Sequence, residues 1–144
     1  MYSIVMATIN VDTGKFEINM TTIKSFTSLE QSRKLAEILP HKSADTYIGN
    51  YVGESGKVDG TNIHYYPKGE SFGAPEIIDA WSLAALLNVL PAECECMSLE
   101  HINYGNNHKK YFMSYIGGEN TDTYDNPVDA CVAMIEKLNK LNML

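Results

Sequence analysis

The sequence predicts an α+β fold in which antiparallel strands pack against three helices in the order ββα-ββ-αββα. Several segments alternate apolar and polar residues with the period of a strand, two Leu- and Ala-rich segments each end at Leu-Pro, and a C-terminal segment repeats apolar residues at helical spacing. With 144 residues, of which 44% are hydrophobic and 20% charged, the chain fits one domain, residues 1–144, that can bury a core without disulfides or metal.

The first elements are expected to be a β-hairpin and a helix. Residues 2–7 and 16–20 alternate in side-chain type on either side of an Asp-Thr-Gly-Lys turn. Thr27 and Glu30 match a capping box, which makes Thr27 the expected N-cap of the helix. Pro40 ends this helix, because proline lacks the N–H that would continue it and disfavours the helical conformation of the residue before it.

The middle of the chain is expected to contain two strands and a second helix. The strands are placed at about 46–52 and 62–66, separated by glycine-rich loops. Asp79 is the expected cap of a helix over residues 80–90 that is apolar around most of its circumference and is therefore expected to be largely buried. The expected core residues are Trp81, Leu83, Leu86, Leu87, Ile135 and Leu138.

The C-terminal third is expected to form a hairpin and the last helix. Residues 94–102 and 109–116 are interpreted as two strands around a Gly-Asn-Asn turn. Asn126 is the expected N-cap of the last helix, with Pro127 at its first position, followed by an apolar stripe at helical spacing.

The charge of the chain argues against two classes of partner. A net charge of −7 disfavours nonspecific binding to nucleic acid or anionic membranes, which both attract clustered Lys and Arg. Residues 79–144 hold four basic and nine acidic residues, hence −5, so a nucleic-acid-mimicking face stays open as an alternative to a solvated surface. Residues 81–90 form the longest apolar run, and it is shorter than the ~20 residues that span a bilayer.

The cysteines and the first residues indicate a cytoplasmic protein. Three cysteines, an odd number, and an opening segment without the basic and apolar regions of a secretory signal are typical of reduced thiols in the cytoplasm. Cys131 falls within the apolar stripe of the last helix, so it is interpreted as a structural thiol.

No motif predicts a catalytic residue, a metal site or a cofactor. Cys94 and Cys96 lie near His101 and His108, but structural zinc sites usually contain two closely spaced ligand pairs. Residues 49–57 resemble a phosphate-binding loop yet lack its first Gly and its final Ser or Thr. The acidic residues 119–126 lack the register of a calcium loop and are better explained as favourable charges near the start of the last helix.

The nine tyrosines are the remaining unusual feature of the sequence. Tyrosine is a good strand former, which favours a role in the fold, but it is also frequent at protein interfaces. The tyrosines that are adjacent or nearly so are therefore the candidate partner-binding residues: Tyr47, Tyr51, Tyr65 and Tyr66.

Two motifs carry a resemblance to a known family. The first matches S-x-K-L-A-E-x-L-P-x-x-S-A-D, at Ser32, Lys34, Leu35, Ala36, Glu37, Leu39, Pro40, Ser43, Ala44 and Asp45. The second matches W-S-L-x-A-L-L-x-x-L-P, at residues 81–87, Leu90 and Pro91. With these motifs the chain resembles a family of uncharacterised proteins from Bacteroides-type bacteria and their phages or prophages. The resemblance covers most of residues 26–144 and implies no activity.

The sequence therefore leads to two competing hypotheses about function. The first is a non-enzymatic accessory protein of phage or prophage origin that binds another macromolecule, with a protein as the expected partner. The alternative is an enzyme or small-ligand-binding protein whose site combines dispersed residues such as His64, His101, His108 and the acidic residues 119–126. A concave pocket that joins these histidines to carboxylates favours the alternative, whereas scattered histidines and an exposed aromatic patch favour binding.

Overall fold

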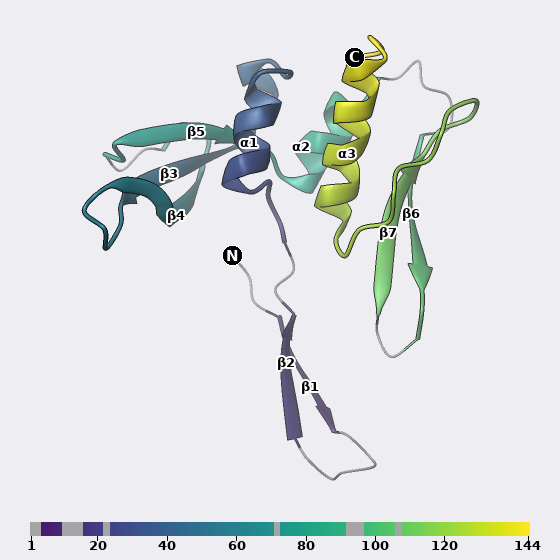
Figure 1. Ribbon diagram of the computed structural model, residues 1–144, viewed down its shortest axis with the longest axis horizontal. Coiled ribbons are helices and arrows are strands. Elements are labelled where there is room, and N and C mark those ends of the chain that lie inside the picture. Colours follow the sequence, from purple (N-terminus) through teal and green to yellow (C-terminus); the bar gives the residue numbers. More distant parts are fainter. Residues whose placement is uncertain (1–3, 10–15, 22–23, 71–72, 92–96, 106–107) are drawn as a thin grey trace.

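The predicted fold class is confirmed by a computed structural model that describes residues 4–9, 16–21, 24–70, 73–91, 97–105 and 108–144. Three helices and three antiparallel sheets make up the described part of the chain (Figure 1). The elements follow the order β1, β2, α1, η1, β3, β4, β5, α2, β6, β7 and α3. This order contains one strand, β5, that the sequence prediction lacked.

The strands form three separate sheets. The expected N-terminal hairpin is present as β1 (Ile4–Ile9) and β2 (Phe16–Thr21), and its Asp-Thr-Gly-Lys turn lies outside the described residues. The central sheet has the order β4-β3-β5, built from β3 (Thr46–Val52), β4 (Val58–Pro67) and β5 (Glu76–Ala80). The last hairpin consists of β6 (Ser98–Asn103) and β7 (Lys109–Ser114).

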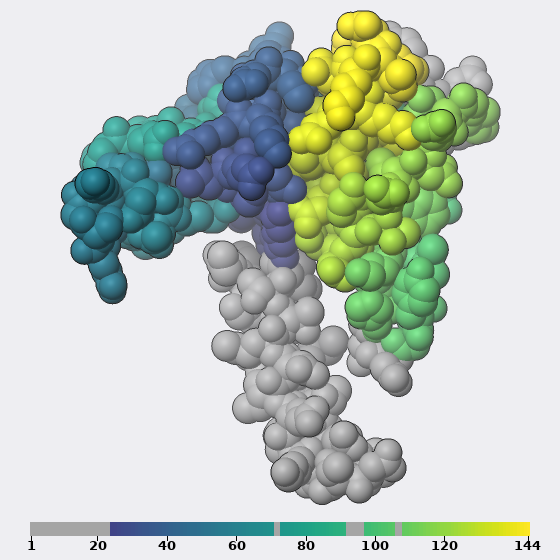
Figure 2. All heavy atoms as spheres, in the orientation of Figure 1, coloured from purple at the N-terminus to yellow at the C-terminus, as the bar shows by residue number. Residues whose placement is uncertain are grey.

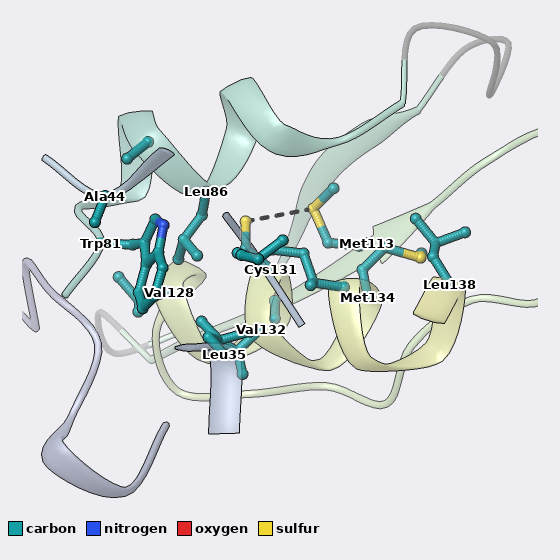
Figure 3. Close-up of a cluster of buried hydrophobic side chains, with 14 residues drawn as sticks. Leu35, Ala44, Trp81, Leu86, Met113, Val128, Cys131, Val132, Met134 and Leu138 are labelled. Carbon is teal, nitrogen blue, oxygen red and sulfur yellow. Dashed lines mark hydrogen bonds between the residues drawn. The ribbon is translucent and has the colours of Figure 1, made fainter. Parts of the chain in front are cut away.

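The helices lie between the central sheet and the last hairpin (Figure 1). α1 (Leu29–Ala36) contacts β5 and α3, whereas α3 (Pro127–Lys140) contacts α2 (Leu83–Val89) and β7. Figure 3 shows the resulting core, in which α3 supplies Val128, Cys131, Val132, Met134 and Leu138 to a cluster that Leu35, Trp81, Leu86 and Met113 complete. The apolar stripe predicted for α3 thus faces α1, α2 and the last hairpin at once.

The start of α1 differs from the prediction by one residue. Ser28, not Thr27, is the N-cap: its side chain accepts a hydrogen bond from the Gln31 N–H, and the Gln31 side-chain oxygen accepts one from the Ser28 N–H. The helix also ends at Ala36, before Pro40, and a 3₁₀ turn, η1 (His41–Ser43), follows the proline.

The second helix is shorter than predicted, and Asp79 does not cap it. Residues 76–80 form β5, and α2 begins after Ser82, whose side chain accepts the Ala85 N–H. Trp81 and Leu86 are fully buried, as are Ile135 and Leu138 of α3, and Leu83 is half-buried. Leu87 is 41% exposed, so its placement in the core was wrong. It lies on the side of α2 that the described residues leave uncovered, because α2 packs against α3 along one face.

The cap of the last helix is as predicted. The Asn126 side chain accepts the Asp129 N–H at 2.9 Å, and Pro127 occupies the first turn, where its missing N–H costs nothing. Across the described residues, none of the helices has the length and apolar content that a membrane crossing requires.

Candidate binding groove

The structure separates the four candidate tyrosines. Side chains alternate between the two faces of a strand, so the register places Tyr47, Tyr51 and Tyr66 on one face of the central sheet and Tyr65 on the other. Tyr65 lies on the face that α1 covers, where its hydroxyl donates to the Thr27 carbonyl at 3.0 Å and its ring stacks on Phe26. Tyr65 therefore joins the sheet to the segment before α1.

The opposite face of the sheet is partly covered by the connection from β4 to β5. The hydroxyls of Tyr51 and Tyr66 are 2.9 Å apart, and this hydrogen bond raises the pKa of Tyr51. Gly49 lies between the two rings: an added Cβ would be 2.9 Å from Tyr66, 3.0 Å from Tyr51 and 3.1 Å from Ala74 of the connection. Tyr51 and Tyr66 consequently pack within the fold, and Tyr47 is left nearest to the edge strand β5.

A surface groove runs along the outer edge of β5 and faces α1. Its lining, which we call the edge groove, consists of Arg33, Ala36, Glu37, His41, Tyr47, Gly69, Ile77, Ile78 and Asp79. Ile77 and Ile78 point to opposite faces of the sheet, so a hollow that touches both must lie at the strand edge. Figure 2 shows that α1 and the central sheet adjoin on the molecular surface.

The helix side of the edge groove is held in place by an ion pair. Both carboxylate oxygens of Glu76 accept hydrogen bonds from the Arg33 guanidinium at 3.0 Å. The buried Asn50 side chain donates to the same carboxylate at 2.6 Å. The hydrogen bond from Asn50, together with the Arg33 charge, lowers the pKa of Glu76. These contacts join α1 to β5 beside the groove.

The other end of the edge groove contains a histidine paired with a carboxylate. Nδ1 of His41 lies 2.5 Å from a carboxylate oxygen of Asp79, and the His41 ring stacks on Tyr47 with 6.2 Å between centroids. The Asp79 side chain is 13% exposed and that of His41 is 68% exposed, so the carboxylate orients an imidazole that faces solvent. The described residues that line the groove include no Ser, Thr or Cys that such a histidine could activate.

The other histidines do not join a common site. His64 is exposed on the central sheet beside Tyr51 and Tyr66, while His101 and His108 are exposed on the last hairpin. Within the described ranges, no group of three or more His, Cys, Asp or Glu side chains is arranged to hold a metal ion. Cys94 and Cys96 lie outside those ranges.

The acidic residues 119–126 are tied to neighbouring lysines and to the start of α3. Lys137 donates to the Glu119 carboxylate at 3.1 Å, and Lys110 pairs with Asp125 at 2.6 Å. Thr121 and Tyr124 also make backbone hydrogen bonds to β7. The segment therefore lies alongside β7 as an irregular third chain next to the two strands of the hairpin.

The glycine-rich loop at residues 53–57 joins β3 to β4 and is unsuited to phosphate. Ser55 and Thr61 donate hydrogen bonds to the Asp59 carboxylate, which lowers the pKa of Asp59 to about 2. A carboxylate that stays ionised at this position repels an anionic ligand.

Cys131 is a structural thiol, as the sequence indicated. Its side chain is fully buried and donates to the Met113 sulfur at 3.7 Å. Burial raises the pKa of the thiol to about 12, so the reactive thiolate is not formed at neutral pH.

The two Leu-Pro motifs meet in space. Trp81 donates its indole N–H to the Ser43 hydroxyl at 3.0 Å. Asp45 accepts hydrogen bonds from both the backbone N–H of Ser82, at 2.9 Å, and the Ser82 hydroxyl. We call Ser43, Asp45, Trp81 and Ser82 the motif clamp, because they join the segment after α1 to the start of α2. Their role in the fold is structural.

Sequence reasoning missed most of the edge groove. Arg33, Ala36 and Glu37 are spaced three and four residues apart. This spacing indicates from the sequence alone that the three residues share one face of the helix. Nothing in the sequence indicated that Ile77 and Asp79 line a groove. They lie on β5, a strand that the sequence analysis did not predict. A scan against protein-family models found no match, and searches of curated proteins and of solved structures found no similar protein.

Proposed function

We propose that this chain is a non-enzymatic binding protein that recognises another protein through the edge groove. The observation that carries the proposal is the combination of a hollow with a strand edge: β5 pairs with β3 on one side, and no described strand pairs with its other side. An unpaired edge exposes backbone donors and acceptors to any chain that can reach it.

Apolar and aromatic side chains at the groove support this proposal. Ile77 is 46% exposed on β5, and the half-buried Tyr47 is its diagonal neighbour on the same face of the sheet. Interfaces are enriched in such side chains because desolvating them favours association. Tyr47 is also one of the tyrosines that the sequence selected.

The proposal also includes a cytoplasmic location and a phage or prophage origin. A cytoplasmic location agrees with the reduced, buried thiol of Cys131. The phage or prophage origin that the resemblance implies stays a prediction.

Site-specific photo-crosslinking tests the proposed function. The photoreactive residue p-benzoyl-phenylalanine replaces Ile77 in the groove or, as a matched control, Leu87 on α2, which is exposed to a similar degree (46% and 41%). After irradiation in an extract of the source organism, we expect a discrete crosslinked protein with the residue at position 77 and none at position 87. Equal products at both positions, or none at 77, would contradict a partner site in the groove.

A second candidate function is binding of a small ligand at the same groove. The His41–Asp79 pair supports it, because an oriented, solvent-facing imidazole suits both hydrogen bonding and proton transfer. Under this hypothesis His41→Gln abolishes ligand binding, whereas the crosslink at position 77 still forms if a protein is the true occupant. The two functions are therefore separable in one set of variants.

A further inference from the structure

We infer that the N-terminal hairpin, β1 with β2, packs one apolar face against an apolar hollow that begins at Lys24, and so forms a strap across the start of α2. The hollow shares no lining residue with the edge groove. The contact therefore holds whether or not the edge groove binds a partner.

The register of β1 with β2 gathers apolar residues on one face of the hairpin. Residues directly opposite each other in an antiparallel pair share a face, and the faces alternate along each strand. On one face all three pairs are apolar: Val5 with Met20, Ala7 with Ile18 and Ile9 with Phe16. On the other face every pair includes a polar residue: Ile4 with Thr21, Met6 with Asn19 and Thr8 with Glu17. The hairpin is thus an amphipathic ribbon.

Such a ribbon requires a partner for its apolar face. An isolated two-stranded hairpin is at best marginally stable in water, and packing of an apolar face against another element is what stabilises it. Among the described elements, β1 and β2 make extensive contacts only with each other. The apolar face that contains Ile18 is therefore a sheet face still to be covered.

A preformed apolar hollow of about 750 Å³ lies next along the chain. Its apolar lining includes Phe26, Tyr65, Pro67, Leu83, Ala84 and Pro127. The ring of Phe26 stacks on Tyr65 with 5.3 Å between centroids, and the backbone of Phe26 forms a β-bridge with Ser82. These contacts join the segment before α1 to the central sheet and to the start of α2, so the walls of the apolar hollow are fixed.

The charged groups at the apolar hollow already have partners. Asp45 accepts hydrogen bonds from Ser82, and Lys24 forms an ion pair with Asp129. A charged ligand would have to compete with these partners, whereas an uncharged apolar occupant leaves them intact. The apolar face of the hairpin contains no charged residue. Its composition therefore matches the apolar hollow.

The hairpin is attached at the rim of the apolar hollow. β2 ends at Thr21, and the lining begins at Lys24, so two residues separate them. A tether this short gives the hairpin an effective concentration on the order of millimolar at the hollow, whereas a second copy of the chain is present only at its bulk concentration. Each strand of the hairpin spans about 20 Å, which is long enough to cross the hollow.

The first test places the same charge on either face of the hairpin. Ile18→Asp adds a carboxylate on the apolar face, and Asn19→Asp, the matched control, adds one at the neighbouring position on the other face. In NMR spectra of the full chain, we expect Ile18→Asp to shift the amide signals of residues 65–66 and 83–84 and Asn19→Asp to leave them in place. Equal shifts with both variants, or none with Ile18→Asp, would overturn the strap.

The reciprocal test keeps the sequence of the hairpin intact, so a hairpin that merely fails to fold cannot explain the result. Ala84→Glu places a carboxylate in the apolar hollow, whereas Asn88→Glu places one at an exposed position of α2 outside its lining. We expect Ala84→Glu to accelerate amide hydrogen exchange in residues 4–9 and 16–21 about tenfold or more, and Asn88→Glu to leave it unchanged. Exchange that is the same in the two variants would contradict the contact.

Two further measurements distinguish the strap from other occupants. In sedimentation, a dimer of the original protein that Ile18→Asp converts to a monomer would show that the hairpin covers a second copy. The apolar dye anilinonaphthalene sulfonate should bind Ile18→Asp more strongly than the original protein, because loss of the strap opens the apolar hollow. Equally strong dye binding by the two proteins would show that the hollow is open to small molecules. Either that result or the dimer would overturn the inference.

Discussion

The motif clamp and the edge groove share the 3₁₀ turn η1, whose His41 lines the groove and whose Ser43 belongs to the clamp, but they differ in how their polar groups are used. In the clamp, Trp81 and Ser82 direct their hydrogen bonds at Ser43 and Asp45, and the Trp81 ring is fully buried. In the groove, Glu37 and Ile77 are exposed, and the edge of β5 has no described strand partner. The clamp is thus built from motif residues that bond to one another, whereas the groove combines Ala36 and Glu37 of the first motif with Ile77, which belongs to neither motif.

The largest expected effect breaks the clamp. Trp81→Ala removes the largest fully buried side chain and its bond to Ser43, and we expect it to lower the free energy of unfolding by about 3–5 kcal/mol. Ile77→Ala, at the groove, should lower it by less than about 1 kcal/mol, because this side chain is nearly half exposed. Urea denaturation followed by far-UV circular dichroism measures both free energies of unfolding. Similar losses for Trp81→Ala and Ile77→Ala would contradict the contrast between clamp and groove.

The next effect concerns the junction between α1 and α3. Asp129 accepts hydrogen bonds from Lys24 at 2.5 Å and Gln31 at 2.7 Å, as well as from Asn126. Burial alone would raise the pKa of Asp129, but these hydrogen bonds outweigh it and lower the pKa. Asp129→Asn is therefore expected to cost about 1–3 kcal/mol at neutral pH.

This cost should depend on pH in a definite direction. A carboxylate with a lowered pKa in the folded state stabilises the fold fully above its unfolded pKa, about 3.9 for aspartate, and the contribution disappears as the pH falls through the folded pKa. The difference between the original protein and Asp129→Asn should thus be constant near neutrality and shrink below about pH 4. If the difference in the free energy of unfolding between the two proteins grew as the pH fell, the stabilising hydrogen bonds to the Asp129 carboxylate would be contradicted.

A comparison of similar size contrasts Thr27, the predicted N-cap of α1, with Ser28, which is the N-cap in the structure. Thr27 does not cap the helix; its hydroxyl accepts the Trp81 N–H at 3.1 Å and lies 2.7 Å from that of Ser32. Thr27→Val leaves a buried N–H without its acceptor and is expected to cost about 1–3 kcal/mol, against about 1 kcal/mol for Ser28→Ala at the cap. Thermal unfolding of the two variants checks the order, and a larger loss for Ser28→Ala would contradict it.

The smallest effect is expected at the groove itself. Glu37→Gln changes an exposed side chain without an ion pair to any described residue, so the free energy of unfolding should change by less than about 0.5 kcal/mol. A larger loss in the same denaturation assay would show that Glu37 serves the fold and is not kept free for a ligand.

The sequence predicted elements well where local signals were sufficient. Asn126 and Pro127 identified the start of α3, and the strand placed at about 46–52 matches β3. At α1 the capping-box pattern fits twice, as Thr27 with Glu30 and as Ser28 with Gln31, and the tertiary bond from Trp81 to Thr27 decides between them. β5 was missed because it is five residues long and its Asp79 resembles a helix cap.

The candidate site was predictable only in part. The tyrosine pattern selected Tyr47, which lines the groove, together with Tyr65, which stacks on Phe26 on the other face of the sheet. The strand period separates such residues once the register is known, but the register of β3 with β5 joins segments some thirty residues apart. No local pattern in one sequence reveals that pairing.

The most direct test of the account measures stability and partner retention together in two variants. Immobilised Ile77→Glu should lose the protein that crosslinks at position 77 while its unfolding midpoint stays unchanged. Asp45→Ala, which removes the clamp's acceptor for Ser82, should keep that protein while its midpoint falls. Retention by Ile77→Glu together with loss by the still folded Asp45→Ala would contradict the division between a clamp that builds the fold and a groove that binds.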